Sequence, residues 1–202
     1  MNFKLFDRPP EGVTVDGKFF RCDFDFRNVL KFADMMTRED ITPDAREYLC
    51  VKCVYSRFLA ANTAPKVYRA LCDALFEKAA ETGGKRLFSF EQDAPIIRAA
   101  FRQVYGINLF RDRLSWFEFL ELLHGLPEGN RFNDVISIRA RPLPAPTKYN
   151  AKERESLLKA KQAVALHLDE REQANKYQSD VGKVFAGLVG LMKKGSELKH
   201  GE

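Results

Sequence analysis

The segment LSWFEFLELL, residues 114–123, constrains the possible folds of this chain more than any other stretch. As a helix, it is covered over most of its circumference by Trp116 and the phenylalanines and leucines that follow. Only Glu118 and Glu121 form a narrow polar strip. Such a helix is stable in water only when other elements bury it on nearly every side. The segment therefore predicts a globular bundle of helices with Trp116 as a core anchor.

Most of the remaining chain also has apolar residues at helical spacing. Expected helices include residues 26–36, a segment starting at Thr42-Pro43, a run from residue 64 to Gly83-Gly84, and residues 94–105. Either Asp23 or Asp25 can cap the first of these helices.

The one exception to the helical pattern lies near the N-terminus. Asp16-Gly17 separates two short runs rich in valine and phenylalanine, which predicts a two-residue hairpin turn. The expected fold is all-α: a multi-helix globular domain with a short N-terminal β-hairpin and a helical C-terminal extension. Prolines at 142, 144 and 146 separate a core domain, 1–148, from 149–202, which holds a charged helix and an amphipathic C-terminal helix.

Composition excludes several classes of protein. With 45% hydrophobic and 30% charged residues, the chain of 202 residues can bury one substantial core. No apolar run approaches the roughly 20 residues that span a bilayer, and no signal peptide is recognisable, so we expect a cytosolic protein. The net charge of +5 comes from 33 basic and 28 acidic residues that alternate along the chain. This mixture favours a solvated surface over nucleic-acid binding.

Cys50 and Cys53 have the metal-like spacing CVKC. A zinc site needs a second pair of ligands, but His124, His167 and His200 are scattered singly. A redox pair usually lies at a helix N-terminus, whereas these cysteines fall inside an expected helix. We interpret them as buried small hydrophobes and expect neither a metal nor a cofactor.

Two acidic residues, Glu91 and Asp93, precede an apolar helical run in FEQDAPIIRAAF, residues 90–101. As an acid/base couple they would need a nucleophile, a histidine base, a metal set or a phosphate-binding loop. The sequence contains no glycine-rich phosphate loop, no GxSxG and no HExxH motif. We therefore expect no catalytic residues and interpret the pair as a helix entrance, at the positive end of the helix dipole.

The start of that helix has two candidate caps. Ser89 and Gln92 have the spacing of a capping box, whereas Asp93 can cap a helix with Pro95 in its first turn. Pro95 favours Asp93, because a proline inside a helix costs about 3 kcal/mol. As a cap, Asp93→Asn is expected to be nearly neutral and Asp93→Ala to cost about 1 kcal/mol.

After the apolar helix, the chain turns through LPEG, residues 126–129, and resumes as a helix to residue 141. Arg139 and Arg141 near its end can hold carboxylates or helix carbonyls, or alternatively a ligand. The structural role is favoured for both.

The segment VGKVFAGLVGLMKK, residues 181–194, is a candidate partner-binding helix. An apolar stripe recurs at helical spacing in Val181, Val184, Phe185, Leu188, Leu191 and Met192. Three glycines within it each cost about 1 kcal/mol, so the helix needs a surface to form on. That surface can be the chain's own core, another copy or a partner; a membrane is disfavoured because few lysines and no aromatic belt accompany the stripe.

Four blocks, in order, resemble a family of small phage proteins. They are VDGKFFRCDFDFRNVLKF, FEQDAPIIRAAFRQVYGINL, LSWFEFLELLHGLPEGNRFNDVISIRARPLP and LLKAKQAVAL. The family looks like tail assembly chaperones of long non-contractile tails, encoded just upstream of the tape-measure gene, chiefly in phages of Gram-positive bacteria. The resemblance spans about residues 13 to 168. Glu91-Gln92-Asp93, Tyr105-Gly106-Ile107, Trp116, Leu126-Pro127 and Arg139 match family positions, where their role looks structural.

The resemblance implies a non-catalytic protein of the host cytoplasm that is absent from the mature virion. Its implied partners are the tape-measure protein, the tail-tube protein and other copies of itself, with no nucleic acid and no membrane. The chain departs from the family where a second aromatic pair often lies near the tryptophan, and beyond about residue 168. A structural virion component, such as a head-tail connector or tail-completion protein, is the alternative function.

Overall fold

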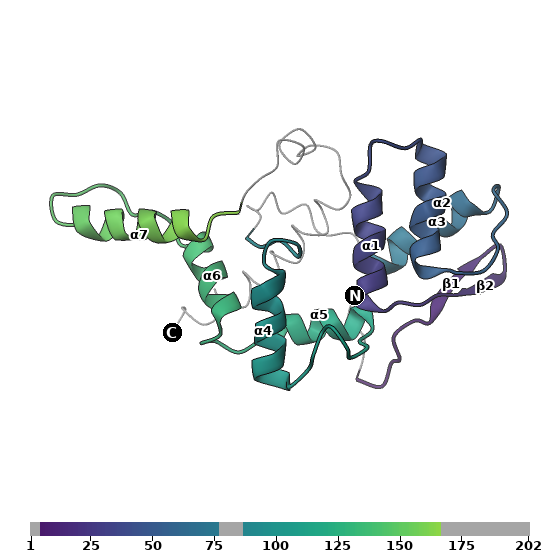
Figure 1. Ribbon diagram of the computed structural model, residues 1–202, viewed down its shortest axis with the longest axis horizontal. Coiled ribbons are helices and arrows are strands. Elements are labelled where there is room, and N and C mark those ends of the chain that lie inside the picture. The colour runs from purple at the N-terminus through teal and green to yellow at the C-terminus, as the bar shows by residue number, and fades with distance from the viewer. Residues whose placement is uncertain (1–4, 77–86, 167–202) are drawn as a thin grey trace. The chain divides into compact units, whose positions relative to one another are not determined.

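The computed structural model describes residues 5–76 and 87–166 (Figure 1). The described chain divides into two compact units. Unit 1 contains residues 5–76 and 113–121, and unit 2 contains residues 87–112 and 122–166. The chain therefore leaves unit 1, builds part of unit 2 and returns to unit 1 before completing unit 2.

Unit 1 begins with a β-hairpin of β1 (Gly12–Val15) and β2 (Lys18–Arg21). The strands are antiparallel, with Val13 opposite Phe20, and both of these side chains are buried. Asp16 and Gly17 form the turn with φ values of 49° and 74°. Two consecutive positive φ angles are the requirement of the tight hairpin turn that the Asp-Gly pair predicted, and the prediction is confirmed.

Three helices complete the first half of unit 1: α1 (Phe26–Met36), α2 (Pro43–Val54) and α3 (Ala64–Leu75). α2 packs against both α1 and α3, and α3 also contacts β1 (Figure 1). Asp25 caps α1, because its Oδ1 accepts a hydrogen bond from the Arg27 backbone N–H at 3.0 Å. In this part of unit 1, the core side chains with no exposed surface are Val29, Phe32, Cys50, Val51, Val67 and Leu71.

The returning segment 113–121 joins unit 1 by backbone pairing. The Phe26 N–H donates to the Leu114 carbonyl at 3.0 Å, and the Trp116 N–H donates to the Phe24 carbonyl at 2.7 Å. This segment includes the first six residues of α5 (Trp116–His124). Along α5, Glu118 and Glu121 are exposed whereas Trp116, Phe117, Phe119 and Leu123 are buried, as the apolar pattern predicted.

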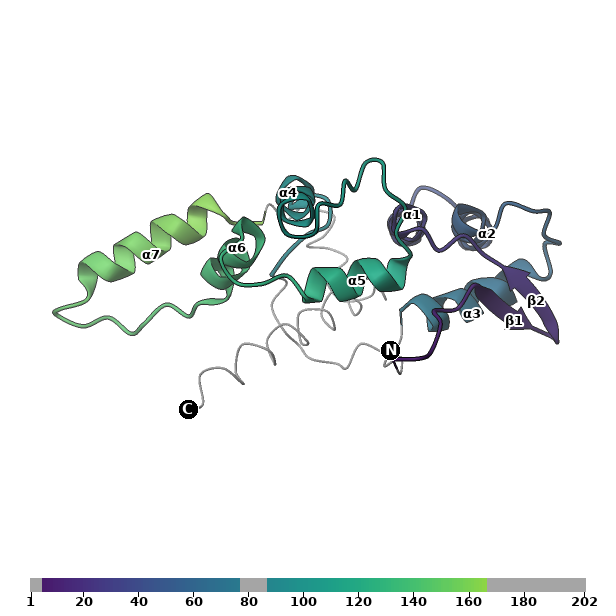
Figure 2. The same cartoon turned by 90° about the horizontal axis from the view of Figure 1, so that it is seen from below.

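Unit 2 contains α4 (Ala94–Tyr105), the end of α5, α6 (Arg131–Ala140) and α7 (Ala151–Ala163). α6 packs against α4 and α7 (Figure 2). α4 ends at Gly106, which has a φ of 70°, and the Gly106 N–H donates to the Arg102 carbonyl. Glycine adopts this left-handed conformation without steric cost because it has no Cβ, which explains its presence here.

The described chain is mostly helical, with one short two-stranded antiparallel sheet. The expected fold, a multi-helix domain with a short N-terminal β-hairpin, therefore agrees with the described chain in these coarse features, and the expected C-terminal extension lies only partly within the described residues. α7, expected after a boundary at residue 148, lies in unit 2 with α4 and α6. The division into 1–148 and 149–202 stays a prediction.

Candidate functional site

The best-defined polar site of unit 2 is a buried ion pair between Asp93 and Arg139. Arg139 Nη1 and Nη2 donate to the two carboxylate oxygens of Asp93 at 2.6 and 2.9 Å. The side chains are only 6% exposed for Asp93 and 10% for Arg139. A two-pronged pair of this kind fixes orientation as well as charge, because the planar guanidinium matches the carboxylate.

Arg139 also holds two backbone carbonyl groups. Its Nη1 donates to the Leu87 carbonyl at 3.0 Å, and its Nε donates to the Val164 carbonyl at 2.5 Å. In return, Lys161 Nζ on α7 donates to the Arg139 carbonyl at 2.8 Å. The guanidinium thus joins three places: the segment before α4, the N-cap residue of α4 and the C-terminal end of α7.

Asp93 is the N-cap residue of α4, and Pro95 lies in the first turn as predicted, but the carboxylate makes no capping hydrogen bond. It accepts from the Ser89 backbone N–H at 2.9 Å and from Arg139. The expectation that the Asp93 side chain caps the helix is therefore wrong. The buried guanidinium is a stronger partner for a carboxylate than a backbone N–H, since the interaction joins two opposite charges away from water.

The turn around Pro127 is fixed by two asparagine side chains. Asn130 Nδ2 and Asn133 Nδ2 both donate to the Pro127 carbonyl, at 2.5 and 2.8 Å. Asn130 Oδ1 also accepts from the Asn133 N–H and so caps α6. Pro127 itself acts through its carbonyl, while Asn130, 3% exposed, supplies the side chain that orders the turn.

Trp116 lies in the core of unit 1 with 2% of its surface exposed. Its indole ring stacks on the ring of Phe119, with the centroids 6.0 Å apart, and packs edge-to-face with the ring of Phe76, with the centroids 6.4 Å apart. The indole Nε1–H donates to the Leu75 carbonyl at the end of α3, at 3.3 Å. The buried N–H is therefore paired, and Trp116 joins the returning segment to α3.

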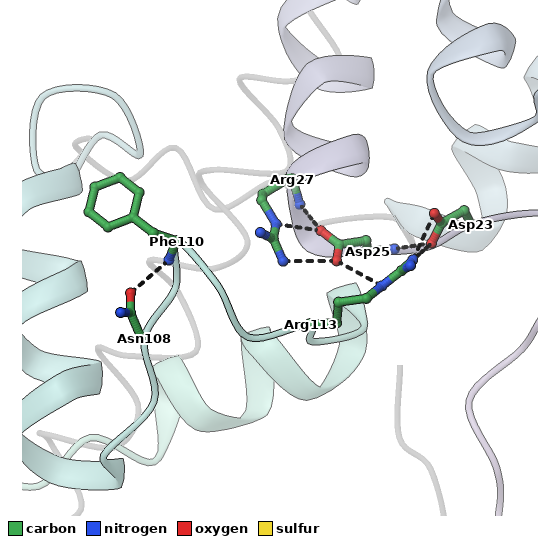
Figure 3. A network of polar contacts seen from close by, with 6 residues as sticks. All are labelled: Asp23, Asp25, Arg27, Asn108, Phe110 and Arg113. Atoms are coloured by element: carbon green, nitrogen blue, oxygen red, sulfur yellow. Dashed lines mark hydrogen bonds and ion pairs between the residues drawn. The ribbon is translucent and has the colours of Figure 1, made fainter.

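A second charged cluster also ties the returning segment to unit 1 (Figure 3). Arg113 Nη2 donates to both carboxylate oxygens of Asp23 at 2.8 Å, and its Nε lies 3.6 Å from Asp25. Arg27 adds two hydrogen bonds to Asp25, at 2.9 and 3.1 Å. Asp23 and Asp25 were both candidate caps; Asp25 is the cap, and Asp23 instead holds Arg113 and the Asp25 N–H.

Of the two cysteines in the CVKC motif, Cys50 is a core residue as predicted, whereas Cys53 is only half-buried. Cys50 has no exposed surface, and burial raises the pKa of its thiol to about 12. Burial also raises the pKa of Cys53, whose Sγ donates to the Leu49 carbonyl. A protonated thiol is a poor nucleophile and a poor metal ligand. In the described parts of the chain, no group of three or more histidine, cysteine, aspartate or glutamate residues could hold a metal ion.

Unit 2 also presents an aromatic side chain that was not among the residues predicted from the sequence. Phe110 is 72% exposed, and the Arg98 guanidinium of α4 lies over its ring, 4.7 Å from the centroid. Asn108 Oδ1 accepts from the Phe110 N–H at 3.1 Å (Figure 3). The signal available in the sequence was the Asn-x-Phe spacing, since asparagine side chains often bond the backbone two residues on.

The predicted partner-binding stripe, from Val181 to Met192, lies outside the described residues. Among the helices in the described ranges, none is both long and apolar enough to cross a membrane.

Comparison with protein-family models matches residues 5–166 to the family described as Bacteriophage Gp15 protein. The chain belongs to this family. Comparison with curated proteins and with solved structures gives no match.

Membership in the Bacteriophage Gp15 protein family confirms the bacteriophage part of the sequence resemblance. The match includes Asp93, Trp116, Pro127 and Arg139, together with every helix and strand described above. The stripe from Val181 to Met192 lies beyond the matched residues. The match thus covers both of the residue ranges that the structure describes, 5–76 and 87–166.

Proposed function

We propose that this protein is a non-catalytic tail assembly chaperone that binds the tape-measure protein and recruits tail-tube subunits during tail morphogenesis. Membership in a bacteriophage family over residues 5–166 is the observation that carries the proposal. Its four sequence blocks resemble chaperones encoded beside the tape-measure gene. The protein is proposed to act in the host cytoplasm, to self-associate and to leave the tail before the virion is complete.

The polar sites of both units support a binding role. The buried charges of unit 2, Asp93 and Arg139, are satisfied by one another and by backbone groups, so they are occupied in holding α4, α6 and α7. Asp25 is likewise engaged by Arg27 and by the α1 N-terminus. Buried charges that are fully hydrogen-bonded make the surrounding helices rigid. Rigid helical surfaces suit a chaperone that binds an elongated client.

Co-expression with the tape-measure protein of the same phage tests the proposal. We expect the tape-measure protein to be insoluble alone, and soluble and co-purified with this protein when both are made together. A tape-measure protein that stays insoluble and unbound would contradict the proposal.

Mass spectrometry of purified virions separates the chaperone from a structural component. A chaperone is absent from the virion, whereas a head-tail connector or tail-completion protein is present in a fixed number of copies. Recovery of this chain at the stoichiometry of a known virion protein would favour the structural alternative.

A further inference from the structure

Phe110 is displayed on a loop whose backbone is held rigidly by local hydrogen bonds. Asn108 is the centre of this loop: its N–H donates to Asp112 Oδ2 at 2.7 Å, and its carbonyl accepts from the N–H groups of Arg111 and Asp112 at 2.8 Å. The next residue, Leu109, is buried. A side chain presented in this way loses little conformational freedom on binding, which lowers the entropic cost of association.

Three arginine residues are close to Phe110 in the structure or in the chain. Arg98 lies over its face, Arg102 is one helical turn further along α4, and Arg111 is its neighbour in the chain. Within the described residues, none of these three arginines forms an ion pair. The Phe110 patch, made of Phe110, Arg98, Arg102 and Arg111, therefore combines an exposed aromatic ring with basic side chains.

Exposed aromatic residues often have no binding role, and Phe58 of unit 1 provides the comparison. Phe58 is 87% exposed, and no cation lies over its ring in the described structure. Phe110 differs in two respects, the cation on its face and the locked loop beneath it. Aromatic rings and arginines are the residue types that most often carry binding energy at protein interfaces, so their combination indicates a contact site.

We propose that the Phe110 patch binds an acidic segment of the tape-measure protein, with an apolar side chain of that segment packed on the Phe110 ring. Charge complementarity identifies the occupant: carboxylates of the segment would pair with Arg98, Arg102 and Arg111. This proposal rests on the proposed function, because it names the client surface that a chaperone of the tape-measure protein would use. It places that surface on unit 2, within the residues shared by the family.

The test measures binding of the full-length protein to overlapping synthetic peptides that cover the tape-measure protein of the same phage. The variants are Phe110→Ala and Arg98→Gln, and Phe58→Ala is the matched control because it removes an exposed phenylalanine from unit 1. Circular dichroism and thermal melting verify that each variant is folded. Arg98 lies on α4 and not in the loop that carries Phe110. Arg98→Gln therefore tests the patch independently of any change that Phe110→Ala causes in the loop.

We expect wild type and Phe58→Ala to bind the same acidic peptides equally. Phe110→Ala and Arg98→Gln should each weaken that binding about tenfold or more, as truncation at the centre of an interface does. Raising the salt concentration should weaken wild-type binding, because screening reduces the attraction between arginines and carboxylates.

Binding by wild type that neither variant weakens would overturn this inference and leave the proposed function standing. The inference is also overturned if the bound peptides are basic, or if the variants change only self-association or binding to a single-stranded thymidine oligonucleotide. If wild type binds no tape-measure peptide and no co-expressed tape-measure protein, the proposed function fails and this inference falls with it.

Discussion

At the scale of single residues, the pair Asp93 and Arg139 illustrates how far local sequence signals reach. Glu91-Gln92-Asp93 before an apolar run correctly indicated a helix entrance, because capping and proline preferences act over four or five residues. The partner of Asp93 lies 46 residues away along the chain. No local pattern specifies such a pairing. The sequence therefore predicted that Arg139 binds carboxylates or carbonyls, but it did not predict which ones.

The buried pair changes the expected effect of substituting Asp93. Asp93→Asn leaves the Arg139 charge buried without a counter-charge, and breaking a buried pair in this way costs about 3 to 5 kcal/mol of unfolding free energy. A simple helix cap would tolerate asparagine almost without loss. Urea denaturation followed by circular dichroism separates the two outcomes. Glu91→Gln, an exposed change two residues away, serves as the control and should stay within about 0.5 kcal/mol of wild type.

Trp116 is a further residue whose substitution we expect to destabilise the protein. Trp116→Ala removes a side chain that is 2% exposed and packed against Phe76 and Phe119, so it should cost about 3 to 5 kcal/mol through the cavity it leaves. Chemical denaturation of the variant beside Phe58→Ala, whose ring is 87% exposed, gives the comparison. Equal stability of Trp116→Ala and wild type would show that the indole is not a core anchor.

At the scale of elements, boundaries marked by proline or glycine were predictable. Pro43 begins α2, Gly106 ends α4, and Asp16-Gly17 forms the hairpin turn. Proline fixes its own φ angle, and glycine adopts positive φ without steric cost, so a few neighbouring residues decide each boundary. The return of residues 113–121 to unit 1 depends instead on Arg113 and Trp116 meeting groups 90 and 41 residues distant. Such long-range contacts leave no periodic trace in the sequence.

The turn before α6 depends on the side chain of Asn130. Asn130→Ala removes the cap of α6 together with the hydrogen bond to the Pro127 carbonyl, so it should cost about 1 to 2 kcal/mol. Asn130→Asp keeps the acceptor that caps the helix and loses the amide donor, so it should fall between alanine and wild type. Thermal melting of the three proteins checks this order. If Asn130→Ala has the same melting temperature as wild type, the Asn130 side chain does not order the turn.

At the scale of the whole molecule, the two units are not consecutive in the chain. The composition change after residue 141 suggested a boundary at 148, because prolines and charges mark linkers in many proteins. The contacts of Arg139 and Lys161 join α6 and α7 within unit 2, and the division at residue 148 stays a prediction. The proline-rich composition of residues 142–146 predicts only the local backbone conformation. It does not predict the hydrogen bond from the Arg139 guanidinium to the Val164 carbonyl, which joins residues on either side of this segment.

The C-terminal stripe is expected to affect association more than folding. The family match ends at residue 166, and the apolar stripe from Val181 to Met192 follows it. We therefore expect deletion of residues 178–202 to leave a soluble protein with a nearly unchanged melting temperature. Because the stripe is proposed to bind a partner or another copy, the same deletion should weaken self-association or tape-measure capture.

The physical reason lies in the glycines of this stripe. Each costs about 1 kcal/mol relative to alanine in a helix, so the apolar stripe needs an external surface to become helical, and its loss should affect association more than folding. Analytical ultracentrifugation and tape-measure pull-down of the truncated and full-length proteins measure the first effect, and thermal melting measures the second. A second variant, Phe185→Ser with Leu188→Ser, interrupts the stripe at full chain length and should reproduce the loss of association. If both variants aggregate or melt much earlier than wild type, the stripe belongs to the core.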